Sequence, residues 1–130
     1  MTTPAVLQAL AEVAGADVCD LLTMGRSSGS PHTVELWFAA DAGRIAFLAG
    51  GRERADWVCN LRALGEAEVT IDRHRFSGRV EWADGTDREA LVRRALAAKY
   101  QGWTEGRPLS GWARGALAVE IVVELLVENG

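Results

Sequence analysis

Apolar and polar residues alternate with a period of two along much of this chain, and this pattern predicts a protein rich in β-strands. In the segment 32–39, for example, Val34, Leu36 and Phe38 point to one side of a strand. Turns of hairpin length separate several of these segments, and such turns favour antiparallel pairing. The predicted strands cover residues 18–24, 32–39, 44–49, 68–72, 75–82 and 116–127.

Other segments carry apolar residues at helical spacing, which predicts helices over residues 4–14, 52–64 and 86–100. The stretch 101–115 holds several glycines and two tryptophans and is predicted to be an ordered loop. Strand-rich chains of this size close into small barrels or sandwiches. We therefore predict a mainly β (α+β) fold, a six-stranded antiparallel barrel with helices at its ends. It forms a single domain over 1–130, with a short N-terminal helix within 1–16.

Composition narrows the classes of function. The chain has 130 residues, 48% of them hydrophobic and 25% charged, with a formal net charge of −4. This acidic balance argues against a nucleic-acid partner, and no apolar stretch in the sequence reaches membrane-spanning length. The N-terminus does not resemble a signal peptide, so we expect a cytoplasmic protein. Cys19 and Cys59 lack the spacing of a metal site and are predicted to be buried and reduced.

The segment 25–31, Gly-Arg-Ser-Ser-Gly-Ser-Pro, is the strongest candidate for a binding site. Arg26 offers a planar fork of donors that suits phosphate, and Ser27 and Ser28 add hydroxyl groups. Gly29 lets the backbone approach a ligand closely. The alternative is a plain β-hairpin loop, because Ser-Gly-Ser-Pro is ordinary turn chemistry.

A second candidate is the junction at Gly50-Gly51, where a strand ends and a helix is predicted to begin. Helix N-termini attract anions, and Arg52 and Arg54 add positive charge nearby. Trp57 and Asn60 lie one helical turn apart, where they would pack on a planar ring and bond its polar edge. The alternative places Trp57 in the core and leaves Asn60 as a solvated helix residue.

Aromatic residues later in the chain form a third candidate. Tyr100 is the only tyrosine and is either a proton donor beside a pocket or an aromatic at a helix end with its hydroxyl in water. Trp103 follows it closely. Trp37 and Trp82 lie in predicted strands, where they fit packing within a barrel or at an interface between subunits.

Four segments of the chain resemble deazaflavin-dependent nitroreductases, which are relatives of pyridoxamine 5′-phosphate oxidase. Residues 22–34, Leu-Thr-Met-Gly-Arg-Ser-Ser-Gly-Ser-Pro-His-Thr-Val, are similar to the L-T-T-x-G-R-x-[ST]-G-x-P-R segment of that family. Residues 43–51 resemble its G-G-R-hydrophobic strand, 56–61 its W-[YF]-x-N-L helix and 100–103 its Y-x-x-[YW] turn. The segments occur in the same order as in the family, and the similarity extends over residues 18–125.

This resemblance implies a split β-barrel homodimer that binds coenzyme F420, an 8-hydroxy-5-deazaflavin, with FMN as the alternative cofactor. It implies an oxidoreductase that passes a hydride from reduced F420 to a small organic acceptor, such as a quinone, a nitroaromatic or an enone. Tyr100 would be the catalytic proton donor and would line the substrate pocket with Trp103. The cofactor would lie against Arg26, Ser27, Ser28, Gly29, His32, Thr33, Val34, Glu35, Leu36, Trp37, Leu48, Ala49, Gly50, Gly51, Arg54, Asp56, Trp57 and Asn60.

The chain also departs from the family pattern. Ser27 and His32 stand at positions that are often basic, which removes positive charge that would meet the oligoglutamate tail of F420. We expect Arg52 and Arg54 to replace that charge. Because FMN has no such tail, an FMN-dependent reductase or oxidase is one alternative. A non-catalytic cofactor-binding protein is another, because the sequence contains no obvious acid–base pair.

Overall fold

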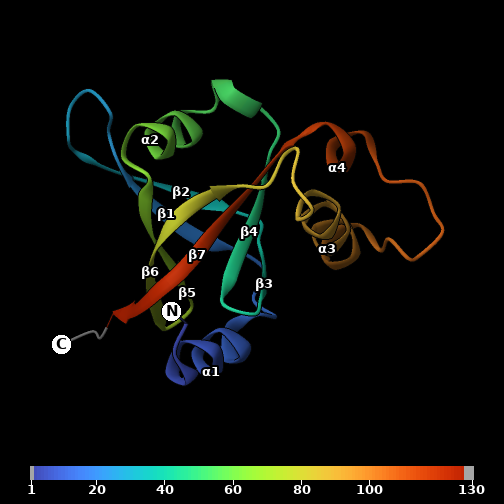
Figure 1. Cartoon of the computed structure of the whole chain (residues 1–130), viewed down its shortest axis with the longest axis horizontal. Helices are drawn as coiled ribbons and strands as arrows, with labels where there is room; N and C mark the ends of the chain where they lie inside the picture. The colour runs from blue at the N-terminus through green and yellow to red at the C-terminus, as the bar shows by residue number, and fades with distance from the viewer. Residues whose placement is uncertain (1, 128–130) are drawn as a thin grey trace.

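The computed structural model describes residues 2–127, and its strands form one antiparallel sheet that curls into a barrel (Figure 1). The strand order is β2-β1-β5-β6-β7-β4-β3. The predicted fold class is confirmed, with seven strands in place of six in the described chain. The strands are β1 Cys19–Met24, β2 Pro31–Leu36, β3 Ala39–Asp41, β4 Arg44–Ala49, β5 Glu66–Ile71, β6 His74–Trp82 and β7 Leu117–Val127.

The additional strand comes from a bend in the predicted strand 32–39. Because β2 and β3 are the two edge strands of the sheet, the run 31–41 reaches both edges and closes the barrel. At the bend, Phe38 turns fully into the core. Its N–H donates to the Tyr100 hydroxyl at 3.0 Å, and its carbonyl accepts from Lys99 Nζ at 3.0 Å. These side chains therefore satisfy backbone groups at the point where the β-ladder is interrupted.

Helices α1 (Pro4–Val13) and α2 (Asp56–Leu64) lie at opposite ends of the barrel (Figure 1). The chain enters α1 through an N-cap at Thr3, whose Oγ1 accepts from the N–H of Val6 at 3.2 Å. The chain leaves α2 at Gly65, whose φ of 78° is the left-handed conformation that commonly ends a helix. Helices at the barrel ends were predicted, and these two occupy that place.

The predicted helix over 52–64 is divided in two. Arg52–Arg54 form a short 3₁₀ helix, η1, and Ala55 is extended, with a ψ of 133°. Arg52 has a φ of 51°, which lies in the left-handed region and cannot belong to a continuous α-helix. The α-helix itself therefore begins only at Asp56.

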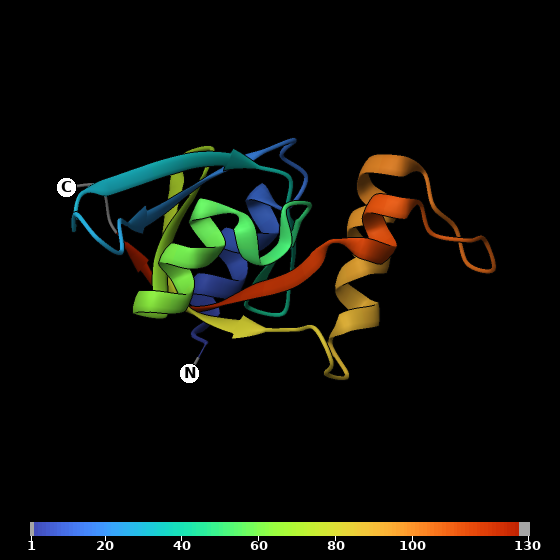
Figure 2. The same cartoon turned by 90° about the horizontal axis from the view of Figure 1, so that it is seen from above.

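Helix α3 (Glu89–Gln101) begins later than predicted, because the Thr86 hydroxyl donates to the carbonyl of Ala83 at 2.6 Å and closes a turn instead of capping the helix. The predicted loop 101–115 contains a further helix, α4 (Gly111–Gly115). Figure 2 shows α3, α4 and the connection between them projecting from one side of the barrel.

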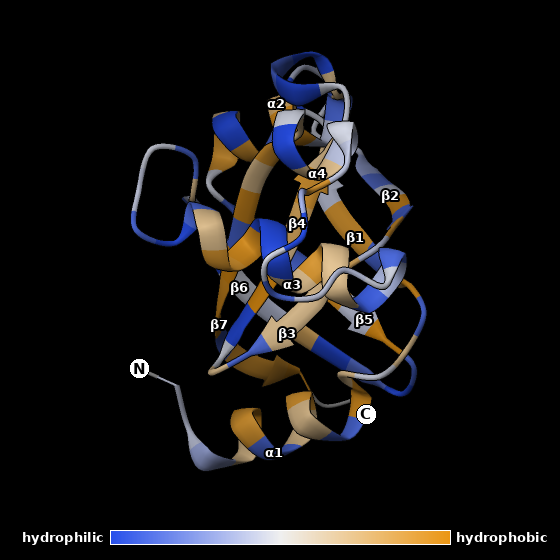
Figure 3. Cartoon of the chain, turned by 90° about the vertical axis from the view of Figure 1, so that its right-hand side faces the viewer, coloured by the Kyte–Doolittle hydropathy of each residue, from blue (hydrophilic) through white to orange (hydrophobic). Residues whose placement is uncertain are grey.

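Strand β4 is covered on both faces, as its apolar sequence predicts. Ile45 and Phe47 point into the barrel core, whereas Ala46 and Leu48 join a second apolar cluster with residues of α3 such as Leu96. A strand buried on both sides has no polar face to expose, which explains the lack of alternation. Coloured by hydropathy, β4 and β7 are largely hydrophobic (Figure 3).

Within residues 2–127, no helix is long and apolar enough to cross a membrane. The His, Cys, Asp and Glu side chains of the same range form no group able to hold a metal ion. Both cysteines are free. Cys19 is buried, and this burial raises the pKa of its thiol to about 12, whereas Cys59 is half-buried.

Candidate functional site

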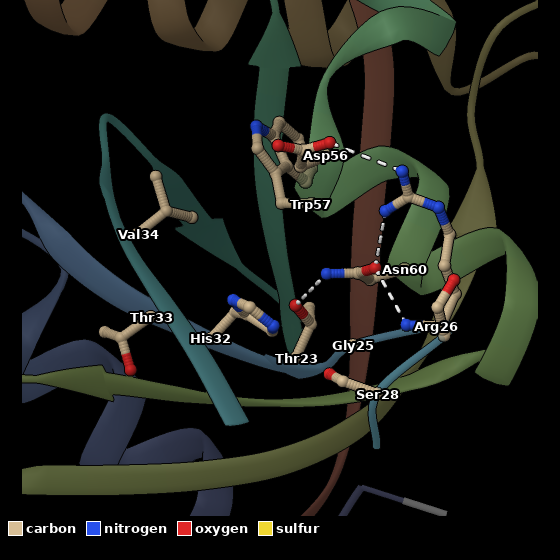
Figure 4. A pocket seen from close by; sticks show the side chains of 11 residues that line it. Thr23, Gly25, Arg26, Ser28, His32, Thr33, Val34, Asp56, Trp57 and Asn60 are labelled. Carbon is tan, nitrogen blue, oxygen red and sulfur yellow. Dashed lines mark hydrogen bonds and ion pairs between the residues drawn. The ribbon is translucent and has the colours of Figure 1, made fainter. Parts of the chain in front are cut away.

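A pocket of about 630 Å³ lies between the turn that follows β1, the first half of β2 and the first turns of α2 (Figure 4). The volume falls in the range of small-molecule sites, roughly 300–1,000 Å³. The elements that line it are far apart in sequence and meet at one end of the barrel. The lining residues are Thr23, Gly25, Arg26, Ser27, Ser28, His32, Thr33, Val34, Asp56, Trp57 and Asn60.

The turn between β1 and β2 is closed by its own backbone. Gly25 N–H donates to the carbonyl of Ser30 at 2.7 Å, and Gly29 N–H donates back to the carbonyl of Gly25 at 2.8 Å. Gly29 has a φ of 71°, which favours glycine. Within residues 2–127, the N–H groups of Ser27 and Ser28 have no hydrogen-bond partner. The turn therefore offers two backbone donors beside the Arg26 guanidinium, a combination that suits an anion.

Arg26 is held in place by α2. Its Nη1 donates to Asn60 Oδ1 at 2.9 Å, and its backbone N–H donates to the same oxygen at 3.2 Å. A longer contact of 3.4 Å joins Nη2 to Asp56 Oδ1. The side chains of Arg26 and Asp56 remain 42% and 89% exposed, so this pair is open to solvent. The guanidinium is positioned by Asn60 and only weakly neutralised by Asp56.

Asn60 is not the solvated helix residue of one predicted alternative, and its bond to the polar edge of a ring stays a prediction. It is only 3% exposed. Its Nδ2 donates to Thr23 Oγ1 at 3.2 Å while its Oδ1 serves Arg26, so both ends of the amide are occupied (Figure 4). Asn60 therefore links β1 to the turn and fixes the position of Arg26.

Trp57 lies in the core, as one of the two predicted alternatives states, and its packing on a planar ring stays a prediction. It belongs to the buried core, where its ring lies 5.9 Å from that of Phe47 in an edge-to-face arrangement, and it also forms a wall of the pocket. Val34 lies among the lining residues contributed by β2. Apolar walls beside a polar turn give the pocket one end with several hydrogen-bond donors and one end suited to a flat apolar group.

Gly25 of the predicted turn lines the pocket, whereas the prediction missed Thr23. Thr23 shares the inward face of β1 with Leu21, so a polar residue at a buried strand position was the available signal. A Cβ built on Gly25 would lie 2.6 Å from Ser28 Oγ and 2.8 Å from His32 Nε2. The turn packs against His32 this closely because residue 25 has no side chain.

The model of the F420H(2)-dependent quinone reductase family matches residues 6–110 of the chain. The chain belongs to this family. The family is one of oxidoreductases that use the deazaflavin coenzyme F420, as the resemblance implied. No curated protein sequence matches the chain.

Solved structures similar to this family member share its fold at low sequence identity. A proposed 5-nitroimidazole antibiotic resistance protein from Bacteroides thetaiotaomicron has a TM-score of 0.72 at 12% identity, covering 97% of this chain and 82% of its own. A proposed pyridoxamine 5′-phosphate oxidase from Listeria innocua has a TM-score of 0.70 at 14% identity, covering 95% and 96%. An F420 reductase has a TM-score of 0.62 at 16% identity, covering 89% and 94%. These likenesses establish the fold.

The structure of this quinone reductase family member leaves several predicted site residues outside the pocket. Leu48 and Ala49 are buried in the two apolar clusters, and Gly50 lies next to the Trp112 ring, with 3.6 Å between that ring and a Cβ built on the glycine. Their roles stay predictions. The residues not brought to the pocket lining are Gly29, Glu35, Leu36, Trp37, Leu48, Ala49, Gly50, Gly51, Arg54, Tyr100 and Trp103.

Tyr100 forms hydrogen bonds, through its hydroxyl, with backbone groups of Phe38 and Asp17. Its hydroxyl accepts from Phe38 N–H and lies 2.8 Å from the carbonyl of Asp17 and 3.1 Å from that of Phe38. Burial raises the pKa of its phenol and outweighs the hydrogen bond with Phe38, which lowers it. The Trp37 ring stacks on it at 4.4 Å, with Trp112 edge-on to Trp37 at 5.5 Å. The hydroxyl is thus neither free in water nor among the groups that line the pocket.

Trp103 and Arg52 are also engaged elsewhere. Trp103 Nε1 donates to the carbonyl of Arg107 at 2.7 Å within the projecting connection. Arg52 Nη2 donates to Asp84 Oδ2 at 2.8 Å, and its Nη1 donates to the carbonyl of Gly115 at 2.6 Å. These contacts tie the Arg52 guanidinium to Asp84 and Gly115, outside the pocket lining, so it does not supply the pocket charge that we expected of it.

Proposed function

We propose that this chain binds F420 in the pocket and transfers a hydride from the reduced coenzyme to a small organic acceptor, such as a quinone, a nitroaromatic or an enone. Family membership supports the cofactor class. The observation that carries the proposal is the turn 25–30, where the Arg26 guanidinium and the unpaired N–H groups of Ser27 and Ser28 meet at one pocket.

The lining residues fit such a cofactor. A phosphate needs several donors converging on one spot, which Arg26 and the turn backbone provide. A flat ring system needs apolar walls, which Trp57 and Val34 provide. The volume of about 630 Å³ suits a ligand of this size class.

The roles of the protein follow from these positions. The bound deazaflavin supplies the hydride chemistry itself. Arg26 and the turn hold the phosphate, Asn60 fixes Arg26, and the apolar walls exclude water from one side of the ring. Because the Tyr100 hydroxyl is engaged by backbone groups of Phe38 and Asp17, we assign proton delivery to solvent.

FMN is the second candidate ligand, and a specific observation favours it. Asp56 places a negative charge beside Arg26 in the pocket lining, and Arg52 is tied to Asp84 outside the lining. The pocket lining therefore gathers little positive charge for an oligoglutamate tail, which FMN lacks. Both ligands share the phosphate that the turn would bind.

A second copy of the chain is the partner we propose. Strand β2 is an edge strand whose residues are mostly exposed, and Trp37, which follows it, has a relative exposure of 45%. An edge strand with an exposed tryptophan favours association. Light scattering after size exclusion tests this directly: Trp37→Glu is expected to shift a dimer to a monomer, and a monomeric parent protein would contradict the proposal.

The deciding experiment is a titration of the apo-protein with oxidised F420 and, in parallel, with FMN, followed by tryptophan quenching. Trp57 lies in the pocket wall and provides the signal. Tighter binding of F420 supports the proposal, and preference for FMN supports the second candidate. Binding of neither would refute both. An acceptor panel with reduced F420 then separates an enzyme from a non-catalytic binding protein, which would bind the coenzyme without oxidising it.

A further inference from the structure

Asp84 lies outside the pocket lining, and its carboxylate is contacted by three separate parts of the chain. Its Oδ1 accepts from Arg93 Nη2 at 3.0 Å and from the N–H of Ala118 at 2.8 Å, and its Oδ2 accepts from Arg52 Nη2 at 2.8 Å. It lies two residues after the end of β6, in the connection to α3. Its carboxylate thus joins α3, the start of β7 and the segment after β4.

Neighbouring groups stabilise the ionised form of the Asp84 carboxylate. Burial raises the pKa of Asp84, but the Ala118 N–H bond and the guanidinium groups of Arg52 and Arg93 lower it further, so the pKa lies below its ordinary value. Arg93 is buried, and its Nη1 also donates to the carbonyls of Ala113 and Ala116 at 3.0 and 2.7 Å. Arg93 therefore connects α3 and α4 to the Asp84 carboxylate.

Arg52 connects this cluster to the pocket helix. Its φ of 51° is unfavourable for a residue with a side chain, and such a conformation persists only where the surroundings hold it. Asp84 and the carbonyl of Gly115 hold the Arg52 side chain. The carbonyl of Arg52 in turn accepts from the N–H of Ala55 at 3.2 Å, immediately before Asp56 begins α2.

We propose that Asp84 is a positioning residue for the pocket, which fixes segment 50–55 through Arg52 and so sets the N-terminal turns of α2. Those turns supply Asp56, Trp57 and Asn60 to the pocket. The part of this proposal that concerns cofactor affinity rests on the proposed function. The part that concerns the local order of α2 does not, because that order can be measured without a ligand.

Glu120 provides a matched control. Like Asp84, it is a carboxylate that bridges two arginines, but it is more deeply buried: Oε1 lies 3.2 Å from Arg44 Nη1, and Oε2 lies 2.9 Å from Arg88 Nη2. None of its bonds involves segment 50–55. Glu120→Gln therefore removes the charge of another arginine-bridging carboxylate, and a more buried one, without altering the contacts that lead from Asp84 to α2.

The test compares Asp84→Asn with Glu120→Gln by hydrogen exchange over residues 50–60 and by F420 titration. Both variants are expected to melt at lower temperature than the parent. Only Asp84→Asn should speed exchange in 50–60, and it should weaken F420 binding by about tenfold, whereas Glu120→Gln leaves both nearly unchanged. Equal exchange over 50–60 in the two variants would overturn the proposal.

A second variant allows the proposal to be tested even if Asp84→Asn does not fold, and a double-mutant cycle tests whether the two residues act together. Arg52→Ala alters a half-exposed side chain and should reproduce the faster exchange even if Asp84→Asn does not fold. In a double-mutant cycle, Arg52→Ala and Asp84→Asn should be non-additive, because they break the same path. If the parent protein does not bind F420, the proposed function fails, and the exchange comparison alone decides whether Asp84 positions α2.

Discussion

Two Gly-Arg turns of this protein, Gly25-Arg26 and Gly51-Arg52, suggest the same anion-binding role in the sequence but have different surroundings in the structure. Arg26 meets a neutral amide and one solvent-exposed carboxylate, and it lines the pocket. Arg52 meets the half-buried carboxylate of Asp84 and a backbone carbonyl at shorter distances. Whether each arginine is available to a ligand therefore depends on partners that lie far away in the sequence.

The largest effect is expected from Arg26→Ala. Loss of one charge-assisted contact, about 1.5–3 kcal/mol, should weaken F420 binding by about tenfold or more. The melting temperature should change little, because the side chain is partly exposed. Arg114→Ala, an exposed arginine on α4, is the control and should bind like the parent. If Arg26→Ala binds F420 as tightly as the parent, Arg26 does not contact the ligand. Neither of the two Gly-Arg turns would then serve as an anion site.

Asn60→Ala should produce the largest loss of stability. Asn60 is buried, and its removal leaves Thr23 Oγ1 and the backbone N–H of Arg26 without their partner, at a cost of about 1–3 kcal/mol in free energy of unfolding. Chemical denaturation measures this value. F420 affinity should fall as well, since Arg26 loses its support. A variant as stable as the parent would show that the amide does not organise the turn.

Two substitutions of Arg52 distinguish the contribution of its side-chain contacts to stability from the cost of its backbone conformation. Arg52→Ala and Arg52→Gly both remove the contacts with Asp84 and Gly115, but glycine tolerates the φ of 51° better than alanine. Arg52→Gly should therefore melt at a higher temperature than Arg52→Ala. The reverse order in thermal scans would mean that the backbone relaxes when the side chain is removed.

The smallest effect is expected from Asp56→Asn. The carboxylate is highly exposed and its contact with Arg26 is long, so the melting temperature should stay the same within error. Removing a negative charge beside the guanidinium should tighten binding of an anionic ligand by about twofold. Weaker binding of F420 by this variant would show that Asp56 contacts the ligand favourably instead of competing with it for Arg26.

The sequence predicted the parts of the fold that depend on local periodicity. The apolar run in β4 indicated a strand buried on both faces, and the structure covers both. The bend at Phe38 was missed, because its backbone groups are satisfied by Tyr100 and Lys99, which no local pattern links to it. Helix α4 was missed because its few residues include two glycines, which disfavour helices.

Prediction of the site had the same limit. The turn around Arg26 was found from residue types alone, and the structure places a pocket there. Whether Asn60 faced solvent or Arg26 could not be read from its helical position, because the deciding partner, Thr23, lies on a different strand. The Asp84 cluster was missed because an acidic residue after a strand usually signals only a turn.

The bend at Phe38 also bears on how the chain folds. Its two hydrogen-bond partners lie 61 and 62 residues away in the sequence, on α3, so these bonds cannot form before α3 has docked. Contacts of such long range slow folding, because loop-closure entropy is lost before they form. We therefore expect barrel closure to be a late step in refolding, and the stacking of Trp37 on Tyr100 provides a fluorescence signal that reports when it occurs.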